Sequence, residues 1–122
     1  MQKDKPLFLI GYSGHAVVAC DILLSNGVRP SGYFERESKL YNPYSLPYLG
    51  DEQTAAGLAL LRHASYFVAI GDNDIRQKVT TQLIGATGNS PTNAIHQSAI
   101  ISTSASIGYG VMLGAGVVIS AC

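Results

Sequence analysis

Three short segments of the sequence place glycine or charged residues directly after an apolar run. They are Gly11-Tyr12-Ser13-Gly14-His15, Glu35-Arg36 and Gly71-Asp72-Asn73. A glycine turn that leads into a helix leaves backbone N–H groups free at the positive end of the helix dipole, which suits a phosphate. A carboxylate about 20 residues after such a turn suits ribose hydroxyls or a base N–H. The chemistry indicated is nucleotide binding.

The same residues also allow simpler interpretations. The glycine turn can be a strand-to-helix turn and nothing more, and Glu35 or Arg36 alone can be a solvated surface charge. Asp72 or Asn73 is a natural N-cap for a following helix. In the functional interpretation, Gly71 admits a ligand closely and Asn73 bonds a nucleotide.

Two familiar motifs do not fit the first glycine turn. A dinucleotide fingerprint would need glycine where Ser13 and Ala16 stand, which disfavours an NAD-type domain. A nucleophile elbow would need glycine at His15, and no Asp and His pair in the required order completes a triad. Arg76, one turn into a later helix, is either a phosphate partner or a surface charge.

Strand and helix patterns alternate through the first 90 residues. Apolar runs predict strands, and apolar residues three or four apart predict helices. We expect strands at Leu7–Ile10, Gly32–Phe34 and Ser65–Ile70, a loop over 36–48 and a linker from Gly85 to Pro91. We expect one helix over 15–26, with Val18 and Ile22 on one face, and a second from an Asp51 cap to Leu61. A third helix should follow Asn73, with Ile75, Val79 and Leu83 on one face. The alternation predicts the α/β class with a Rossmann-like parallel sheet, whose ligands bind beyond the carboxyl ends of the strands.

A period of six marks the end of the chain. The aliphatic residues that carry it are Ile95, Ile101, Ile107, Leu113 and Ile119. Such hexads are typical of a left-handed parallel β-helix, in which three hexads close one coil. We expect residues 1–90 to form the nucleotide-binding domain and 91–122 to form an incomplete start of the β-helix. About three or more repeats are needed for stability, so either the chain is expected to be part of a longer protein or something else covers the open end of the coil.

Composition excludes several classes. Eight basic residues balance eight acidic ones, so no basic footprint for nucleic acid is present. No apolar stretch is long enough for a membrane span, and no signal region follows the N-terminus. Cys20 and Cys122 make no metal or redox spacing. We therefore expect no metal, and a cytoplasmic protein with reduced thiols.

Three motifs together resemble a known family. Residues 10–16 (IGYSGHA), 67–76 (FVAIGDNDIR) and 94–102 (AIHQSAIIS) resemble the bacterial sugar acyltransferases of the sialic acid O-acetyltransferase type. The nearest branch is the UDP-4-amino-sugar N-acetyltransferases, such as the bacillosamine-pathway enzyme. The resemblance implies a Rossmann-like domain that binds a UDP-amino sugar, a β-helix that binds acetyl-CoA between subunits, a homotrimer, and a role in surface glycan or glycoprotein biosynthesis.

The resemblance also implies site residues. The substrate-binding residues are Gly11, Ser13, Gly14 and His15 around the diphosphate and sugar, Glu35 and Arg36 at the uridine, and Gly71, Asp72 and Asn73 at the second nucleotide turn. Arg36 stands where the family commonly has an aspartate, which leaves Glu35 to hold the uridine.

No catalytic residue is assigned. The family's base is a histidine on a later coil, and His15, His63 and His96 do not occupy its place. The chain alone is expected to be inactive. The alternatives are a nucleotide-sugar-binding or structural module without catalysis, or O-acetylation of a sialic-acid-like sugar.

Overall fold

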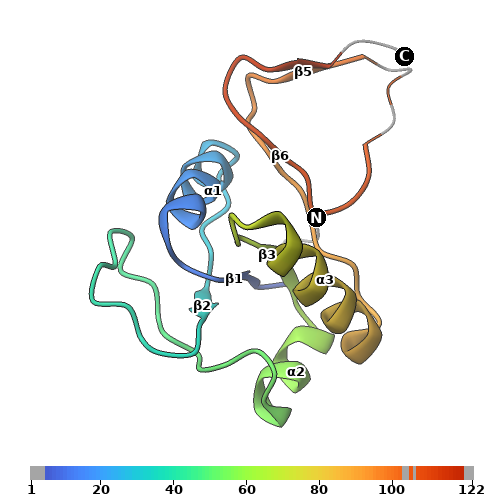
Figure 1. Cartoon of the computed structure of the whole chain (residues 1–122). Helices are drawn as coiled ribbons and strands as arrows, with labels where there is room; N and C mark the ends of the chain where they lie inside the picture. Colours follow the sequence, from blue (N-terminus) through green and yellow to red (C-terminus); the bar gives the residue numbers. More distant parts are fainter. Residues whose placement is uncertain (1–4, 103–104, 106, 120–122) are drawn as a thin grey trace.

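The computed structural model describes residues 5–102, 105 and 107–119. The elements along them are β1 (Leu7–Ile10), α1 (Gly14–Ser25), β2 (Gly32–Phe34), α2 (Ala55–Arg62), β3 (Ser65–Val68), α3 (Asn73–Thr87), β4 (Ala94–Ile95), β5 (Ile100–Ile101), β6 (Met112–Leu113) and β7 (Val118–Ile119). Elements β1 to α3 form an α/β unit, and β4 to β7 form a coil beside it (Figure 1). The predicted mixed α/β class with parallel strands is confirmed. Within the described residues, no helix is long and apolar enough to cross a membrane.

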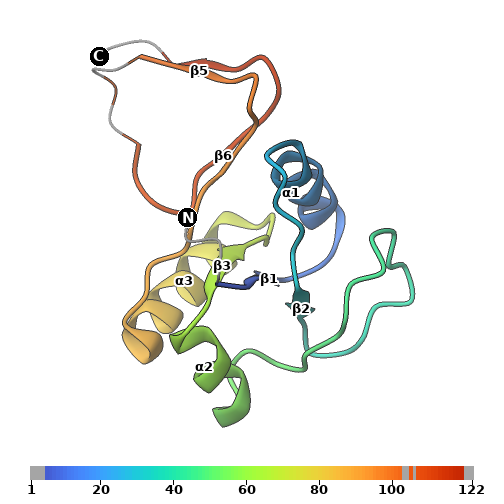
Figure 2. The same ribbon diagram turned by 180° about the vertical axis from the view of Figure 1, so that it is seen from behind.

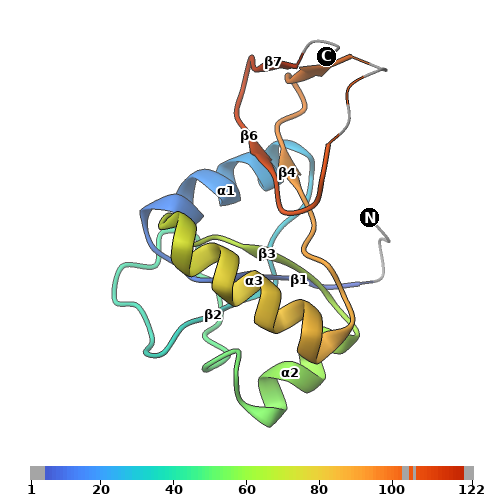
Figure 3. The same ribbon diagram turned by 45° about the vertical axis from the view of Figure 1, so that its right-hand side comes forward.

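β1 is the central strand of a parallel sheet with the order β2-β1-β3. All four of its residues are buried, as expected of a strand covered on both faces. Leu7 and Leu9 pack in a cluster with α1, whereas Phe8 and Ile10 pack with α2 and α3, because strand side chains alternate between faces. Figure 3 shows α1 on one side of the sheet and α3 on the other. The three carboxyl strand ends therefore meet at one edge, between two helical layers.

The coil completes one circuit in 18 residues. β4 pairs in parallel with β6 and β5 with β7, so that Ala94 faces Met112 (112 − 94 = 18) and Ile100 faces Val118. This circuit of three hexads is seen from opposite sides in Figures 1 and 2. The five hexad aliphatics are half-buried, whereas Ile100 and Val118 are 64% and 61% exposed. The hexad residues thus face the inside of the coil, and the left-handed β-helix stays a prediction.

The coil is anchored to the α/β unit through α1. Ala94 is fully buried in the same cluster as α1, and Met112 packs against that cluster. The Asn26 side-chain amide, directly after α1, donates to the Ile95 carbonyl oxygen at 2.6 Å. The start of the coil therefore shares a core with the α/β unit, and the predicted domain boundary after residue 90 stays a prediction.

The predicted start of α2 is wrong. Thr54 is the N-cap, and its Oγ1 accepts a hydrogen bond from the Gly57 N–H at 3.0 Å. Asp51 instead accepts from the Gln53 N–H at 2.9 Å in the preceding turn. Both residues are of types that cap helices well, and the helix that Thr54 caps buries Gly57 and Leu61.

Two predicted boundaries also move. β3 ends at Val68, two residues earlier than predicted, although the Ala69 N–H still donates to the Ile10 carbonyl oxygen at 2.8 Å. α3 continues through Gly85, the predicted start of the linker, and ends where Gly88 takes the left-handed conformation (φ 75°). Gly85 is therefore helical, and the polar linker begins three residues later.

Two predicted apolar faces include an exposed residue. Val18 and Ile75 are 50% and 53% exposed. The buried residues of α1 are Ala16, Ala19, Cys20, Ile22 and Leu23, a stripe that leaves Val18 outside. Leu83 is the buried residue of α3, and Val79, one turn earlier, packs partly buried against the same cluster.

Candidate functional site

The turn after β1 depends on glycine. Gly11 has a φ of 93°, and an added Cβ would lie 3.1 Å from Ile70 Cγ1 and 3.2 Å from the Ala69 carbonyl oxygen. Its N–H donates to the Phe34 carbonyl oxygen at 2.9 Å. The backbone thus passes closely between the ends of β2 and β3, which only glycine permits without strain.

The N-terminus of α1 is open. Ser13 is the N-cap, yet its side chain makes no capping hydrogen bond. The N–H groups of Gly14 and His15 lie in the first turn, where a helix offers no acceptor. A Cβ on Gly14 would meet no described atom within 4 Å, and its φ lies outside the left-handed region. Among the described residues the Ser13 side chain does not cap these donors, and a positive helix end of this kind suits an anion. Phosphate binding at this turn stays a prediction.

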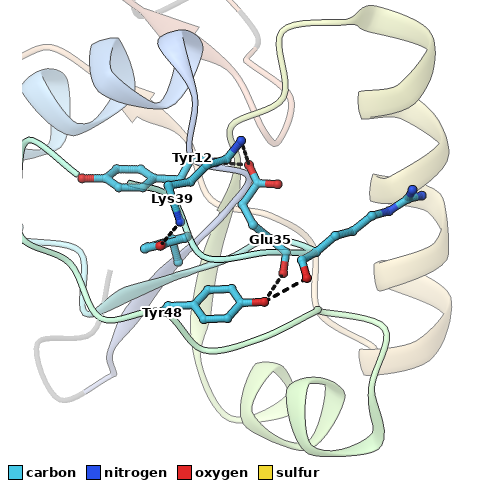
Figure 4. A network of polar contacts seen from close by, with 6 residues as sticks. Tyr12, Glu35, Lys39 and Tyr48 are labelled. Carbon is cyan, nitrogen blue, oxygen red and sulfur yellow. Dashed lines mark hydrogen bonds and ion pairs between the residues drawn. The ribbon is translucent and has the colours of Figure 1, made fainter. Parts of the chain in front are cut away.

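Glu35 holds this turn in place. Its Oε2 accepts a hydrogen bond from the Tyr12 backbone N–H at 2.7 Å, and Lys39 Nζ lies 3.8 Å away (Figure 4). The Tyr48 hydroxyl donates to the backbone carbonyl oxygens of Glu35 and Arg36, both at 3.0 Å. The sequence indicated a ligand-binding carboxylate, but the structure adds a positioning role that the sequence did not reveal.

The end of β3 is fixed by side chains of α3. Asp72 is the N-cap of α3, as the sequence allowed, and its Oδ1 accepts from the Ile75 N–H at 2.9 Å. Arg76 Nη1 donates to the Ile70 carbonyl oxygen at 3.1 Å, and Nη2 donates to Asn73 Oδ1. Asp72, Asn73 and Arg76 are thus engaged in holding the turn.

One cavity of about 460 Å³ lies at the carboxyl ends of the strands, and we call it the strand-end pocket. Five of the predicted residues line it: Gly11, Ser13, Glu35, Arg36 and Gly71. Lys39 and Glu52 also line it, and the sequence had not indicated either. Ile75 and Val79 of α3 supply apolar surface. The pocket therefore offers carboxylates, cations and an apolar wall beside the helix N-terminus.

A second cavity, of about 320 Å³, lies between the α/β unit and the coil, and we call it the junction pocket. It is lined by His15, Phe67, Val68, Arg76, Gly110, Val111 and Met112. Asn73 lines a neighbouring cavity of about 390 Å³ that shares Arg76 with it. Gly14 and Asp72 line none of these three cavities. The predicted set is therefore divided between the strand-end pocket and the junction.

Two of the ionisable groups that line these three cavities, His15 and Glu52, have shifted pKa values. Burial, followed by the charge of Arg76, lowers the pKa of His15. Burial, followed by the neighbouring carboxylate of Asp51 and more weakly that of Glu35, raises the pKa of Glu52. His15 is accordingly a neutral imidazole at neutral pH, able to donate or accept a hydrogen bond.

The other two histidines have local roles. His63 is the C-cap of α2. His96 Nδ1 accepts a hydrogen bond from the Ser98 N–H at 3.0 Å, at the first bend of the coil. No group of three His, Cys, Asp or Glu side chains suited to a metal occurs in the part of the chain that the structure describes.

Solved structures share this architecture. A mutant of perosamine N-acetyltransferase from Caulobacter crescentus, in complex with CoA and GDP-perosamine, matches with a TM-score of 0.82 and 35% identity over 97% of this chain and 55% of that one. PerB from the same organism, in complex with the same two ligands, matches with a TM-score of 0.81 at the same identity and coverage. The chain thus spans about half the length of these relatives.

A more distant match shows the fold alone. The acetyltransferase domain of PglB from Neisseria gonorrhoeae, in complex with acetyl coenzyme A, has a TM-score of 0.73 and 24% identity over 95% of this chain and 62% of that one. The model of the PglD N-terminal domain matches residues 6–83, which hold the three-stranded sheet and α3 as far as Leu83. The chain therefore belongs to the PglD N-terminal domain family.

Proposed function

We propose that the chain is the nucleotide-sugar-binding part of an acetyl-CoA-dependent N-acetyltransferase. Its substrate is an amino sugar carried on a nucleoside diphosphate and acetylated at the C4 amine, in cytoplasmic synthesis of a surface glycan or glycoprotein. The observation that carries the proposal is the strand-end pocket, which joins an open helix N-terminus to carboxylates and cations in a PglD-family domain. The similarity to an N-acetyltransferase in complex with CoA and GDP-perosamine supports it.

Each part of such a substrate has a suitable place. The diphosphate suits the free N–H groups of Gly14 and His15, and the nucleoside suits the strand-end pocket. The sugar then extends toward the junction pocket, where His15 and Arg76 lie beside the coil. Acetyl-CoA meets the amine along the coil, which in the proposed assembly is a left-handed β-helix within a homotrimer.

The reaction transfers one acetyl group. The sugar amine attacks the thioester carbonyl carbon, a C–N bond forms, the C–S bond breaks, and the thiolate of CoA leaves. The amine proton passes to a general base. We assign that base to none of His15, His63 and His96, because the last two hold local structure and His15 lies at the phosphate turn.

Calorimetric titration tests the binding part of the proposal. The chain is titrated with GDP, UDP, their 4-amino-sugar derivatives and NADH. We expect a diphosphate nucleotide to bind and NADH not to bind, whereas NADH binding without a nucleotide response would overturn the proposal. Both bases are included because the sequence resemblance points to uridine and the solved relative holds guanosine.

The variant Gly14→Val tests the phosphate turn. A Cβ has open space there and φ is not positive, so the domain should fold while the valine obstructs the approach of a phosphate. We expect a loss of nucleotide affinity of tenfold or more. Gly85→Val is the matched control, because Gly85 is also helical with open space around its Cβ but lies near the C-terminal end of α3 and not at a helix N-terminus. Unchanged affinity in folded Gly14→Val would mean that the turn has no binding role.

Thiol release from acetyl-CoA tests the transfer. We expect none from the chain alone, and release that depends on the amino sugar from the whole protein. Binding without transfer by the whole protein would favour a module without catalysis, and transfer to a hydroxyl would favour O-acetylation. Turnover by the chain itself that His15→Ala abolishes would show that His15 is the base.

A further inference from the structure

We infer that Glu52 selects the nucleobase in the strand-end pocket, by accepting hydrogen bonds from the adjacent N–H donors of guanine, so that the sugar carrier is GDP. This inference rests on the proposed function and names the substrate class of the same site. The sequence resemblance points to UDP and gives Glu52 no role.

The position of Glu52 is fixed by the strand β2. The segment before it runs alongside β2, where the Tyr33 N–H donates to the Pro47 carbonyl oxygen at 3.0 Å and the Leu49 N–H donates to the Tyr33 carbonyl oxygen at 2.9 Å. The Glu35 N–H then donates to the Gly50 carbonyl oxygen at 2.9 Å. This third pairing brings residue 52 to the carboxyl end of β2, and its side chain lines the pocket.

The two carboxylates of the strand-end pocket, Glu35 and Glu52, differ in the contacts that they make within the protein. Glu35 is committed to the turn, because its Oε2 accepts from the Tyr12 N–H and lies 3.8 Å from Lys39 Nζ. Among the described residues no cation pairs with Glu52. Its carboxyl lies against the Asp51 side chain and its own backbone N–H, and it is affected more weakly by the charge of Glu35. Half-burial beside two other acids disfavours its charged form, so a ligand that brings N–H donors is stabilising there. Of the two, Glu52 is therefore the carboxylate suited to reading a base.

The donor pattern of the base decides which nucleotide fits. The Watson–Crick edge of guanine carries N1–H and the N2 amino group side by side, which matches the two oxygens of one carboxylate. Its O6 is an acceptor, and Arg36 or Lys39 at the same pocket can donate to it. Uracil presents one N–H between two carbonyl oxygens, which a carboxylate would repel. The pocket therefore favours guanine both by attraction and by rejection of uracil.

Competition binding with three diphosphates tests this without any mutation. Inosine diphosphate is guanosine diphosphate without the N2 amino group. We expect GDP to bind the wild-type chain at least tenfold more tightly than UDP, with inosine diphosphate between them. Equal or tighter binding of UDP would overturn the inference and leave the proposed function intact. Failure of all three diphosphates to bind would overturn both.

The variant Glu52→Gln tests the residue. An amide keeps one acceptor and adds donors, so we expect GDP affinity to fall by tenfold or more, UDP affinity to hold or rise, and the preference for GDP over inosine diphosphate to disappear. Glu37→Gln is the matched control, because Glu37 is exposed and outside the pocket. Equal weakening of all three nucleotides would show a structural role only and would overturn the assignment. If Glu52→Gln does not fold, Glu52→Ala is tested in the same way.

Discussion

Removal of the Glu35 carboxylate should destabilise the fold through the turn that it holds. Oε2 accepts from the Tyr12 N–H at 2.7 Å, and the Glu35 side chain is 23% exposed. In Glu35→Ala that N–H loses its only acceptor among the described residues. A hydrogen bond to a charged group contributes about 1.5–3 kcal/mol, so we expect a loss of about 2 kcal/mol in the free energy of unfolding.

The ion pair with Lys39 contributes much less. Lys39 Nζ and Glu35 Oε2 are 3.8 Å apart, and the Lys39 side chain is 39% exposed. Such an ion pair contributes about 0.5 kcal/mol or less to the free energy of unfolding. Glu35→Gln keeps a carbonyl oxygen for the Tyr12 N–H and should lose about 1 kcal/mol. The expected order of destabilisation is therefore Glu35→Ala, then Glu35→Gln, then Lys39→Met.

Urea unfolding followed by circular dichroism measures this order. With a slope of about 2 kcal/mol/M, the Glu35→Ala midpoint should fall by about 1 M. Glu37→Gln, in an exposed side chain of the same loop, controls for loss of an acidic charge. A Glu35→Ala midpoint as high as that of Lys39→Met would refute the reasoning, because it would mean that the Tyr12 hydrogen bond adds nothing to stability.

Two further predictions concern the β1–α1 turn. Gly11→Ala should lower stability by about 1–3 kcal/mol, because φ is 93° and the new Cβ would press on Ile70 and the Ala69 carbonyl; a urea midpoint within 0.2 M of wild type would contradict this. The pKa of His15 is lowered in the folded chain, so the unfolded state binds more protons at this group. The stability that neutral His15 contributes is therefore present above pH 6.5 and is lost as the pH falls below it. The wild type should therefore lose more stability than His15→Gln between pH 7.5 and 5.5, and parallel pH profiles would contradict this.

The strands could be predicted from sequence because their signals are local. β1 and β2 have the predicted bounds, since each is a short apolar run between turn residues. Helix ends were harder to place. Asp51 and Thr54 are both cap residues three apart, so their types alone do not distinguish them, and the structure uses Thr54. Gly85 resembles a helix stop, but the helix continues until Gly88 can take a left-handed conformation.

Only the part of the site that lies at the ends of strands could be predicted from the sequence. Gly11, Glu35 and Gly71 come together because parallel strands end at one edge, which sequence order alone implies. Glu52 had no such signal, because it reaches the pocket through the pairing of residues 47–50 with β2. That pairing is a tertiary contact, in which the ring of Tyr48 also lies against that of Tyr33 with centroids 5.5 Å apart.

The two pockets are joined by the same short stretch of backbone. His15 lies at the α1 N-terminus and lines the junction pocket, while Ser13, two residues earlier, lines the strand-end pocket. A Cβ on Gly71 would lie 3.7 Å from His15 Cβ, so the β3–α3 turn packs against the same point. Because α1 also shares its core with Ala94 of the coil, a diphosphate held at this helix end would be fixed relative to both pockets. A sugar attached to that diphosphate would then be directed toward the coil, where the proposed acetyl transfer takes place.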